Sequence, residues 1–395
     1  MMLLLLANIV AAAVTVGSPL PPWQEGYLDI HAINSSRGEC TFIILPDGTS
    51  VLVDAGEFVD YKPAKFDKVP PKPDGQTRPV EVYSRYIRHF LPSVCKGKLD
   101  YAVVTHYHND HIGQIEKWME PDPVRGYELT GIAGVEANIP FQRLLDRAWP
   151  DFAGAQLPSS SKGSGFYPKF VKYACKHDGM KAEAMKVGSR RQIRLRHRPC
   201  RYPGLVVRNY AASGVVWDGK KRVNVYQDTL MRENGASCCF LLSYGDFDYY
   251  TGGDAGGNTL VALPVAQSIG RPVEAMKADH HLSYHTMKDE TMTILRPQVV
   301  VTHSFYERDI QPDIETLSRL LGTDTVYPGP KYFYFTNIGP EQRSLHKELY
   351  DKAAGINGHI VIRVMPGGSE FYVYLLDDTD FEYRVLQVDG PFKCQ

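Results

Sequence analysis

The segment from Leu99 to Thr105 constrains the fold more than any other part of the chain. Its centre, Tyr101-Ala102-Val103-Val104, is an apolar run. It lacks the alternation of apolar and polar residues that is typical of a strand with one solvent-exposed face. A strand of this kind is buried on both faces, so its sheet needs a layer of structure on either side. The run therefore predicts a layered protein with an internal sheet.

Other strands and helices alternate along the chain. Pro79 suits the first turn of a helix, and apolar residues recur at helical spacing after it. Strands alternating with helices in both halves, together with hairpins, indicate an α/β layered sandwich. Strands are predicted at 27–33, 40–45, 50–54, 99–105, 205–210, 238–242, 247–251, 298–302 and 359–364, and helices at 79–91, 141–148 and 168–175.

The N-terminus and the middle of the chain differ in character from the rest. Residues 3–16 are an apolar run of about 14 residues, shorter than the roughly 20 that cross a bilayer as a helix. Small residues and prolines follow, so we interpret 1–18 as a signal peptide, which predicts secretion or export and no transmembrane span. Residues 19–395 are predicted to form one domain, with an insertion or lid at about 118–204.

Charge excludes a global attraction to nucleic acid or to an anionic membrane. Lysine and arginine total 44 against 45 aspartate and glutamate, so the net charge is -1. The strongest local charge is Lys186 to Arg201, where Arg194, Arg196 and Arg198 alternate with other residues. As a strand, this segment presents either a solvated basic face or a wall that steers anionic substrates.

The seven cysteines have no C-x-x-C spacing. This pattern excludes a zinc knuckle and a thioredoxin-like redox pair. Disulfides are compatible with export, but the spacing does not give their connectivity.

Four candidate metal ligands follow the buried strand within six residues, in Thr105-His106-Tyr107-His108-Asn109-Asp110-His111. His106 and His108 are two apart on extended backbone and point to the same side. Imidazole with carboxylate suits zinc, and manganese or iron where oxygen ligands dominate. Burial without a cation would leave these polar groups unpaired, which costs several kcal/mol of folding free energy. The motif therefore predicts a metal site.

This motif resembles the signature of the metallo-β-lactamase superfamily, H-x-H-x-D-H at the end of a strand. Two further landmarks of that family occur in its order, Val51-Leu52-Val53-Asp54-Ala55-Gly56 and Tyr250-Thr251-Gly252-Gly253-Asp254. The resemblance implies a four-layer αββα sandwich and makes 19–395 a hydrolase domain with an inserted helical and loop region. It also implies that Asp254 bridges two metals and that Asp54 orients the site.

Residues 276–283, Met-Lys-Ala-Asp-His-His-Leu-Ser, look like the H-H-G-S element of one branch of that family. The branch contains the competence nucleases of DNA uptake and the choline-phosphate esterases of teichoic acid. Leu282 stands where the branch has glycine. No histidine precedes the Cys238 strand, where other branches supply a ligand to the first metal, so Asn234 or solvent is expected there. One-metal operation is the alternative to two.

The second metal position has two candidate ligand sources. They are the pair His280 and His281, or His303 at another strand end. The pair is favoured because the whole segment 277–283 resembles the H-H-G-S element. The predicted metal ligands are His106, His108, Asp110, His111, Asp254, His280 and His281. The predicted catalytic residues are Asp110, His285 and His303, and the residues predicted to contact substrate are Lys277, Ser283 and Tyr284.

These residues predict a hydrolase that uses a metal-bound hydroxide on a phosphodiester or phosphate ester. The expected cofactor is two Zn²⁺ ions, with manganese or iron as alternatives. The expected substrate is a small or polymeric anion; nucleic acid is compatible with this but is not implied by the net charge. The alternatives are hydrolysis of a carboxylic ester, lactone, thioester or β-lactam, and a non-catalytic, metal-stabilised binding protein.

Overall fold

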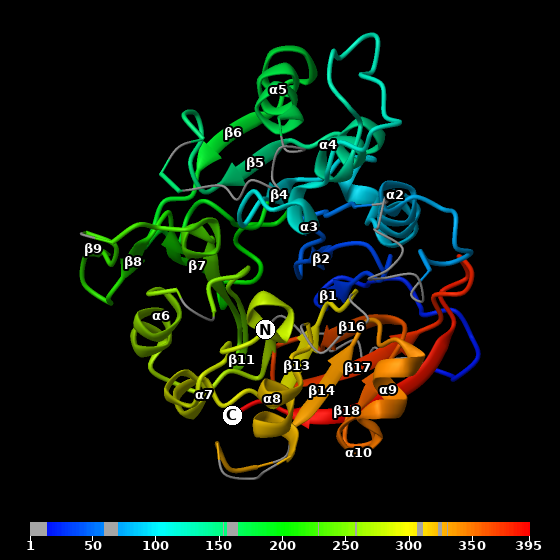
Figure 1. Cartoon of the computed structure of the whole chain (residues 1–395), viewed down its shortest axis with the longest axis vertical. Helices are drawn as coiled ribbons and strands as arrows, with labels where there is room; N and C mark the ends of the chain where they lie inside the picture. Colours follow the sequence, from blue (N-terminus) through cyan, green and yellow to red (C-terminus); the bar gives the residue numbers. More distant parts are fainter. Residues whose placement is uncertain are drawn as a thin grey trace, which may run out of the picture.

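The strands form two sheets, and helices lie on the outer side of each (Figure 1). The computed structural model describes residues 14–58, 70–152, 154–155, 165–227, 229–256, 259–305, 311–322, 326–329 and 331–395. Within these ranges each sheet has nine strands.

The first sheet combines strands from both ends of the chain. The neighbours from β3 to β6 are parallel, and the other neighbours are antiparallel. In order across the sheet, the strands are β18 (Val385–Lys393), β17 (Glu370–Leu376), β16 (His359–Val364), β1 (Leu28–Ala32), β2 (Thr41–Ile44), β3 (Ser50–Val53), β4 (Tyr101–Val103), β5 (Arg143–Asp146) and β6 (Lys181–Ala184).

The second sheet is parallel on one side and antiparallel on the other. The neighbours from β15 to β11 are parallel, and those from β11 to β9 are antiparallel. In order, the strands are β15 (Gly355–Ile356), β14 (Tyr332–Phe335), β13 (Val299–Thr302), β12 (Ala275–Lys277), β11 (Phe247–Thr251), β10 (Cys239–Tyr244), β7 (Leu205–Ala212), β8 (Val215–Trp217) and β9 (Arg222–Asn224).

Helices cover the outer face of each sheet. Those packed on the first sheet are α2 (Pro79–Phe90), α4 (Gly131–Asn138) and α5 (Phe166–Tyr173). Those packed on the second are α6 (Ala262–Ile269), α7 (Asp289–Leu295), α8 (Ile314–Leu317) and α10 (Lys347–Tyr350). The other helical elements in the described ranges are α3 (Asn109–Ile112), α9 (Pro340–Leu345), η1 (Ser93–Cys95), η3 (Ala174–Asp178), η4 (Glu233–Ala236), η5 (Asp279–Leu282) and η6 (Ser318–Gly322).

Strand β4 shows why the apolar run of the sequence requires layers. Tyr101 and Val103 belong to the core between the two sheets, where they meet residues of the second sheet such as Ala275. Ala102 and Val104 belong to the core between the first sheet and its helices. Both faces of β4 are therefore dry, and the predicted four-layer αββα sandwich is confirmed.

Two local predictions were wrong. Residues 141–148 were predicted to be helical, but they contain β5, in which Leu144 and Leu145 pair in parallel with β4 and face opposite cores. Sheet pairing and burial on both faces override the helical spacing. The arginine-rich stretch 194–198 is not a strand. There, the backbone N–H of Arg196 donates to Thr49 Oγ1 at 2.7 Å instead of to a neighbouring strand.

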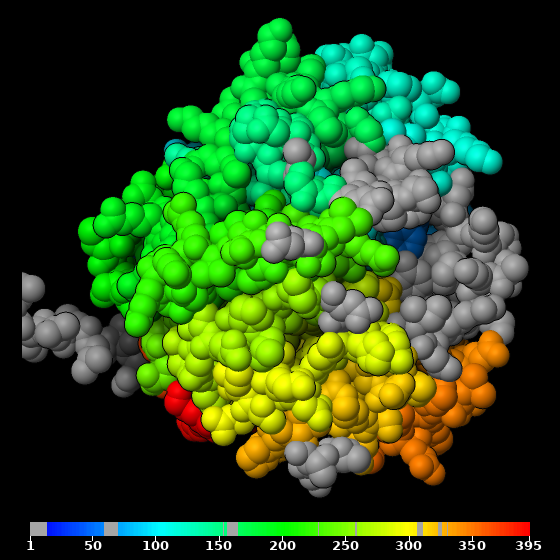
Figure 2. All heavy atoms as spheres, turned by 60° about the vertical axis from the view of Figure 1, so that its left-hand side comes forward, coloured from blue at the N-terminus to red at the C-terminus, as the bar shows by residue number. Residues whose placement is uncertain are grey.

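The described part of 118–204 is built into the first sheet and its helical layer. It supplies β5 and β6 at one edge, together with α4 and α5. In the space-filling view its cyan and green residues are continuous with the rest of the surface (Figure 2). Its role as a lid stays a prediction.

Most of the predicted signal peptide lies outside the described residues, because the description begins at residue 14. No helix in the described ranges combines the length and apolar character needed to span a membrane. All seven cysteines are described, and each is a free thiol.

A buried ion pair joins β1 to β16. The Arg363 guanidinium donates to both carboxylate oxygens of Asp29, at 2.9 and 2.7 Å, and the side chains are 7% and 0% exposed. We expect Asp29→Ala to lower the free energy of unfolding by about 3–5 kcal/mol, because it leaves a buried guanidinium without its counter-charge. Urea denaturation measures the difference.

The matched control is Asp380→Ala, which removes one of the two acidic partners of Arg384, in a pair whose side chains are 43% and 41% exposed. Solvent screens that pair, so the expected loss is about 1 kcal/mol or less. Equal losses in the two variants would contradict the importance of the buried pair.

Candidate metal centre

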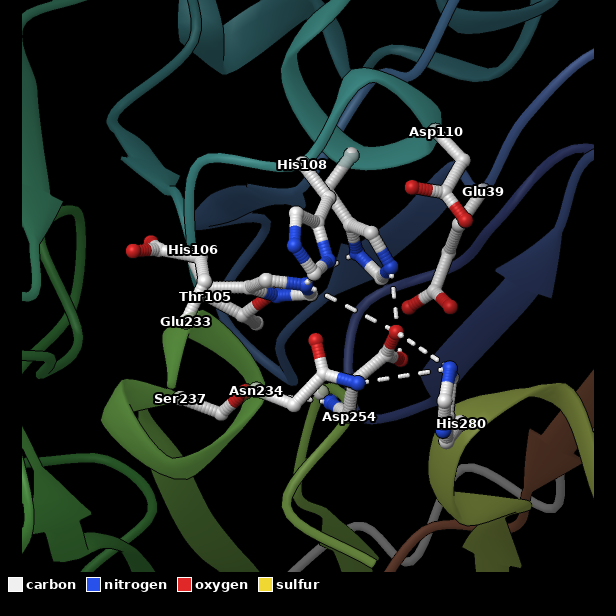
Figure 3. Close-up of polar contacts among 12 residues, drawn as sticks. Glu39, Thr105, His106, His108, Asp110, Glu233, Asn234, Ser237, Asp254 and His280 are labelled. Carbon is white, nitrogen blue, oxygen red and sulfur yellow. Dashed lines mark hydrogen bonds and ion pairs between the residues drawn. The ribbon is translucent and has the colours of Figure 1, made fainter. Parts of the chain in front are cut away.

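The predicted ligands and the orienting residue Asp54 follow the carboxyl ends of strands in both sheets. Asp54 follows β3 and the 106–111 motif follows β4, while Asp254 follows β11 and the His280–His281 pair follows β12. Because parallel strands end at a common edge, side chains from distant segments converge there. Figure 3 shows His106, His108 and His280 lying around Asp254.

The first group of ligands, called here the first position, consists of His106, His108 and Asp254. His106 Nε2 lies 3.0 Å from His108 Nδ1 and 3.6 Å from Asp254 Oδ2. One candidate ligand atom from each residue lies within 4.8 Å of the others. Two imidazole nitrogens and a carboxylate oxygen are a donor set that suits zinc.

The second group, the second position, consists of Glu39, His111, Asp254 and His281. His111 Nε2 lies 3.3 Å from Asp254 Oδ1 and 3.2 Å from His281 Nε2. Asp110 borders this group, with Oδ2 at 3.4 Å from His281 Nε2. Asp254 belongs to both groups, which is the arrangement expected of a bridging ligand.

Buried oxygens without hydrogen-bond donors show that the centre fits cations. Both carboxylate oxygens of Asp254, Oε1 of Glu39 and Oδ1 of Asn234 are buried and accept no hydrogen bond. Leaving such an atom unpaired costs about 1–3 kcal/mol, and more for a charged group. Metal ions in the two positions would supply the missing partners, so the residues present fit one or two divalent cations.

The outer nitrogens of the buried imidazoles are held by fixed partners. Asp54 Oδ2 lies 2.8 Å from His111 Nδ1 and accepts the hydroxyl of Thr105 at 2.6 Å. That hydroxyl lies 3.1 Å from His106 Nδ1, and His281 Nδ1 lies 3.1 Å from the His303 carbonyl oxygen. With Nδ1 engaged, Nε2 of each ring faces the ligand groups. Asp54 thus lies where the resemblance to the family predicts a residue that orients the metal ligands.

The protonation states of Asp254 and His106 favour cation binding. Burial lowers the pKa of His111, but the carboxylates of Asp254 and Asp110 raise it overall, and a metal ion would have to displace that proton. Burial alone would raise the pKa of Asp254, but His111, His280 and His281 hold it well below its usual range. Burial lowers the pKa of His106, and the neighbouring His111 lowers it further. The bridging carboxylate is therefore anionic and the His106 ring neutral, as metal ligation requires.

Glu39, which sequence reasoning missed, lies between β1 and β2 and completes the second position. Lys277 Nζ lies 2.8 Å from Glu39 Oε2 and 3.6 Å from Asp254 Oδ1, and it donates to the Gly253 carbonyl at 2.7 Å. Lys277 was predicted to contact substrate; its side chain is only 1% exposed, so it serves mainly these carboxylates. No motif surrounds Glu39, so only the fold brings it to the centre.

Asn234, predicted together with solvent as a substitute for the missing histidine, contacts His280. Its Nδ2 lies 3.3 Å from His280 Nε2, and its Oδ1 is one of the unpartnered oxygens. His280 also lies near the bridging ligand, with Nε2 at 3.6 Å from Asp254 Oδ2. If the Asn234 amide oxygen completed the first position, it would be a weaker zinc ligand than a third imidazole.

A buried ion pair next to Asn234 fixes the motif itself. Glu233 accepts the backbone N–H of Tyr107 at 2.8 Å and two N–H groups of Arg147, at 2.6 and 2.8 Å. The Arg147 guanidinium also lies 4.1 Å from the centre of the Tyr107 ring. The residue between the two ligating histidines is therefore held from both sides, although nothing in the sequence motif indicates this pair.

The remaining predicted residues lie apart from the two ligand groups. His303 Nε2 is 3.0 Å from Thr41 Oγ1, and burial lowers the pKa of His303 to about 3. Tyr284 and His285 are exposed and line a surface hollow of about 280 Å³. Ser283 is buried. The catalytic roles of His285 and His303 and the substrate contacts of Ser283 and Tyr284 stay predictions.

The backbone around the histidine pair explains the unusual leucine. His280, His281 and Leu282 have φ angles of 48°, 53° and 60°, in the left-handed region. Glycine adopts this region without steric cost, whereas other residues lose about 1–2 kcal/mol. Leu282 is fully buried in the core between the second sheet and its helices, and that burial offsets the cost.

Part of the chain matches the model of a known protein family. Residues 37–148 match the family model described as the metallo-beta-lactamase superfamily. No curated protein matches the chain.

Among solved structures, similarity extends to CmlA, a diiron β-hydroxylase from Streptomyces venezuelae (12% identity, 87% of this chain and 55% of that one, TM-score 0.39). It extends also to a putative metal-dependent hydrolase from Parabacteroides distasonis (12% identity, 77% of this chain and 92% of that one, TM-score 0.34). A third similar structure is Zn²⁺-bound PqqB from Methylobacterium extorquens (12% identity, 72% of this chain and 82% of that one, TM-score 0.35). The chain spans about half the length of CmlA.

The matched segment contains the complete H-x-H-x-D-H motif and Asp54, and the ligands supplied from outside it meet that motif at the edge where the strands end. The sandwich has the layers that the motif requires, and the two groups share Asp254. Residues 37–148 are thus similar to the metallo-β-lactamase superfamily, and the chain has the metallo-β-lactamase fold.

Proposed function

We propose that the protein is a metal-dependent hydrolase of phosphodiesters or phosphate esters that carries two Zn²⁺ ions. The observation that carries the proposal is Asp254, a buried carboxylate without hydrogen-bond donors that is shared by both ligand groups. His106 and His108 would hold one ion, and Glu39, Asp110, His111 and His281 the other. When bound, the ions would activate water and polarise the electrophile.

Charge supports an anionic substrate. The carboxylates at the centre are Glu39, Asp54, Asp110 and Asp254, and Lys277 is the cation paired with two of them. Two divalent ions together with the ammonium group carry more positive charge than the four carboxylates carry negative charge. The loaded centre would therefore attract a phosphate group more strongly than a neutral ester.

Exposure indicates the side from which substrate approaches. The Asp110 side chain is 16% exposed, that of His280 25%, and His108 is partly exposed, whereas His106, His111 and His281 are fully buried. We assign Asp110 the role of orienting the attacking water and accepting its proton. Although burial raises the pKa of Asp110, the charge of His111 and a hydrogen bond with His281 lower it overall, so the carboxylate is anionic.

The first test of the function uses the chelated and the reloaded protein. Hydrolysis of bis-para-nitrophenyl phosphate should be abolished by EDTA and restored by Zn²⁺ or Mn²⁺, because the donor set accepts either ion. A carboxylic ester, a lactone, a thioester and a β-lactam form the comparison panel. A fully metallated protein that hydrolyses members of this panel but no phosphodiester would replace the proposal with the ester alternative. Inactivity on every substrate would favour a binding protein.

A second test concerns the residue that orients His111. Asp54→Ala should weaken metal binding about 10–100-fold, because His111 Nδ1 and Thr105 lose their shared acceptor. Competition with a chromophoric chelator measures the affinity.

His303→Ala is the matched control for metal binding, since the His303 ring hydrogen-bonds Thr41 and belongs to neither ligand group. Its metal affinity should equal that of the unmodified protein. Metal loss in this variant, with affinity retained in Asp54→Ala, would reverse the assignment of these two residues.

A further inference from the structure

A third group of ligand-type side chains lies at the other end of β4. Cys95, Asp100 and His197 each offer a ligand atom within 4.8 Å of the others. Asp100 precedes β4 and the metal centre follows it, so the backbones of Asp100 and His106 are separated by roughly 20 Å of extended chain. This group is therefore independent of the metal centre.

The three ligand atoms are spaced as zinc requires. Cys95 Sγ lies 3.9 Å from His197 Nε2 and 3.6 Å from Asp100 Oδ2, and the nitrogen and oxygen are 3.0 Å apart. Zinc bonds of about 2.3 Å to sulfur and about 2.0–2.1 Å to nitrogen and oxygen place tetrahedral ligands about 3.3–3.6 Å apart. Shifts of a few tenths of an ångström would therefore close the group around an ion.

The arrangement does not suit a nucleophilic cysteine. The same nitrogen of His197 faces both the thiol and the carboxylate, whereas a proton relay from cysteine through histidine to aspartate needs both ring nitrogens. Burial also raises the pKa of Cys95 to about 12, so the free thiol stays protonated. A cation that takes sulfur, nitrogen and oxygen ligands explains the convergence better than nucleophilic catalysis does.

One carboxylate oxygen of this group, Asp100 Oδ2, makes several polar contacts. Asp100 Oδ2 accepts the N–H of Ser50 at 3.0 Å and its hydroxyl at 3.2 Å, in addition to its contacts with His197 and Cys95. An ion in the group would replace the protons that the thiol and the imidazole direct at this oxygen. The Gly48 carbonyl, 3.2 Å from the sulfur, and water on the exposed side of His197 are available as a fourth ligand.

We propose that Cys95, Asp100 and His197 form a structural Zn²⁺ site that fastens the basic segment 186–201 to the first sheet. Binding displaces the thiol proton of Cys95 to water and forms a sulfur–zinc bond. Thiolate with imidazole selects zinc over magnesium, calcium and manganese. The segment is already positioned, since the backbone N–H groups of His197 and Arg198 donate to Asp47 Oδ2 at 2.9 and 2.8 Å.

Cobalt substitution of the full chain tests the site without reference to activity. The ligands of the metal centre include no cysteine, so a thiolate-to-cobalt charge-transfer band in the near ultraviolet reports only on this group. The band should appear in the unmodified protein and disappear in Cys95→Ser. Cys200→Ser, which alters an exposed thiol outside the group, should retain it.

Zinc stoichiometry gives the second measurement. Cys95→Ser and His197→Gln should each lose one zinc per chain relative to Cys200→Ser, while phosphodiester hydrolysis stays within about twofold. His197 is partly exposed, so its variant keeps the test valid if Cys95→Ser does not fold. Equal zinc content in all three variants, with no thiolate band, would show a hydrogen-bonded cluster and overturn the proposal.

Discussion

The buried carboxylate of Asp254 determines how the rest of the centre is arranged. It is 1% exposed and has no hydrogen-bond donor, and an isolated anion in such a place costs many kcal/mol. Histidines from both sheets and the ammonium of Lys277 surround it at 3.3–3.6 Å. Lys277 is a single ammonium that is shared with Glu39, and divalent cations between these groups would balance the remaining buried carboxylates.

The buried strand β4 connects this centre to the rest of the fold. Its side chains fill the core between the sheets and the core under the helices, which fixes the strand in position. Thr105, just beyond its end, accepts the backbone N–H of Cys238 from the second sheet at 2.9 Å and lies against Asp54. The motif histidines thus leave a strand that is anchored in both cores and tied to both sheets.

Local patterns predicted the parts of the site that depend on neighbours in sequence. His106, His108, Asp110 and His111 share one strand end, and Asp254 follows a recognisable strand, so their convergence was predictable. Glu39, the pair Arg147–Glu233 and the group Cys95, Asp100 and His197 depend on contacts between distant segments, for which a single sequence carries no signal. The helix predicted at 141–148 failed for the same reason, since pairing with β4 decided its conformation.

The two positions of the centre are unequal, and their inequality follows from the same residues. The second position has Glu39, His111, His281 and Asp254, all buried, with Asp110 at its border. The first has two histidines and the shared carboxylate, and His108 is partly exposed. More anionic ligands and less solvent hold an ion more firmly. We therefore expect the second position to bind an ion more tightly than the first, which has fewer protein ligands and a partly exposed histidine and so would leave room for substrate.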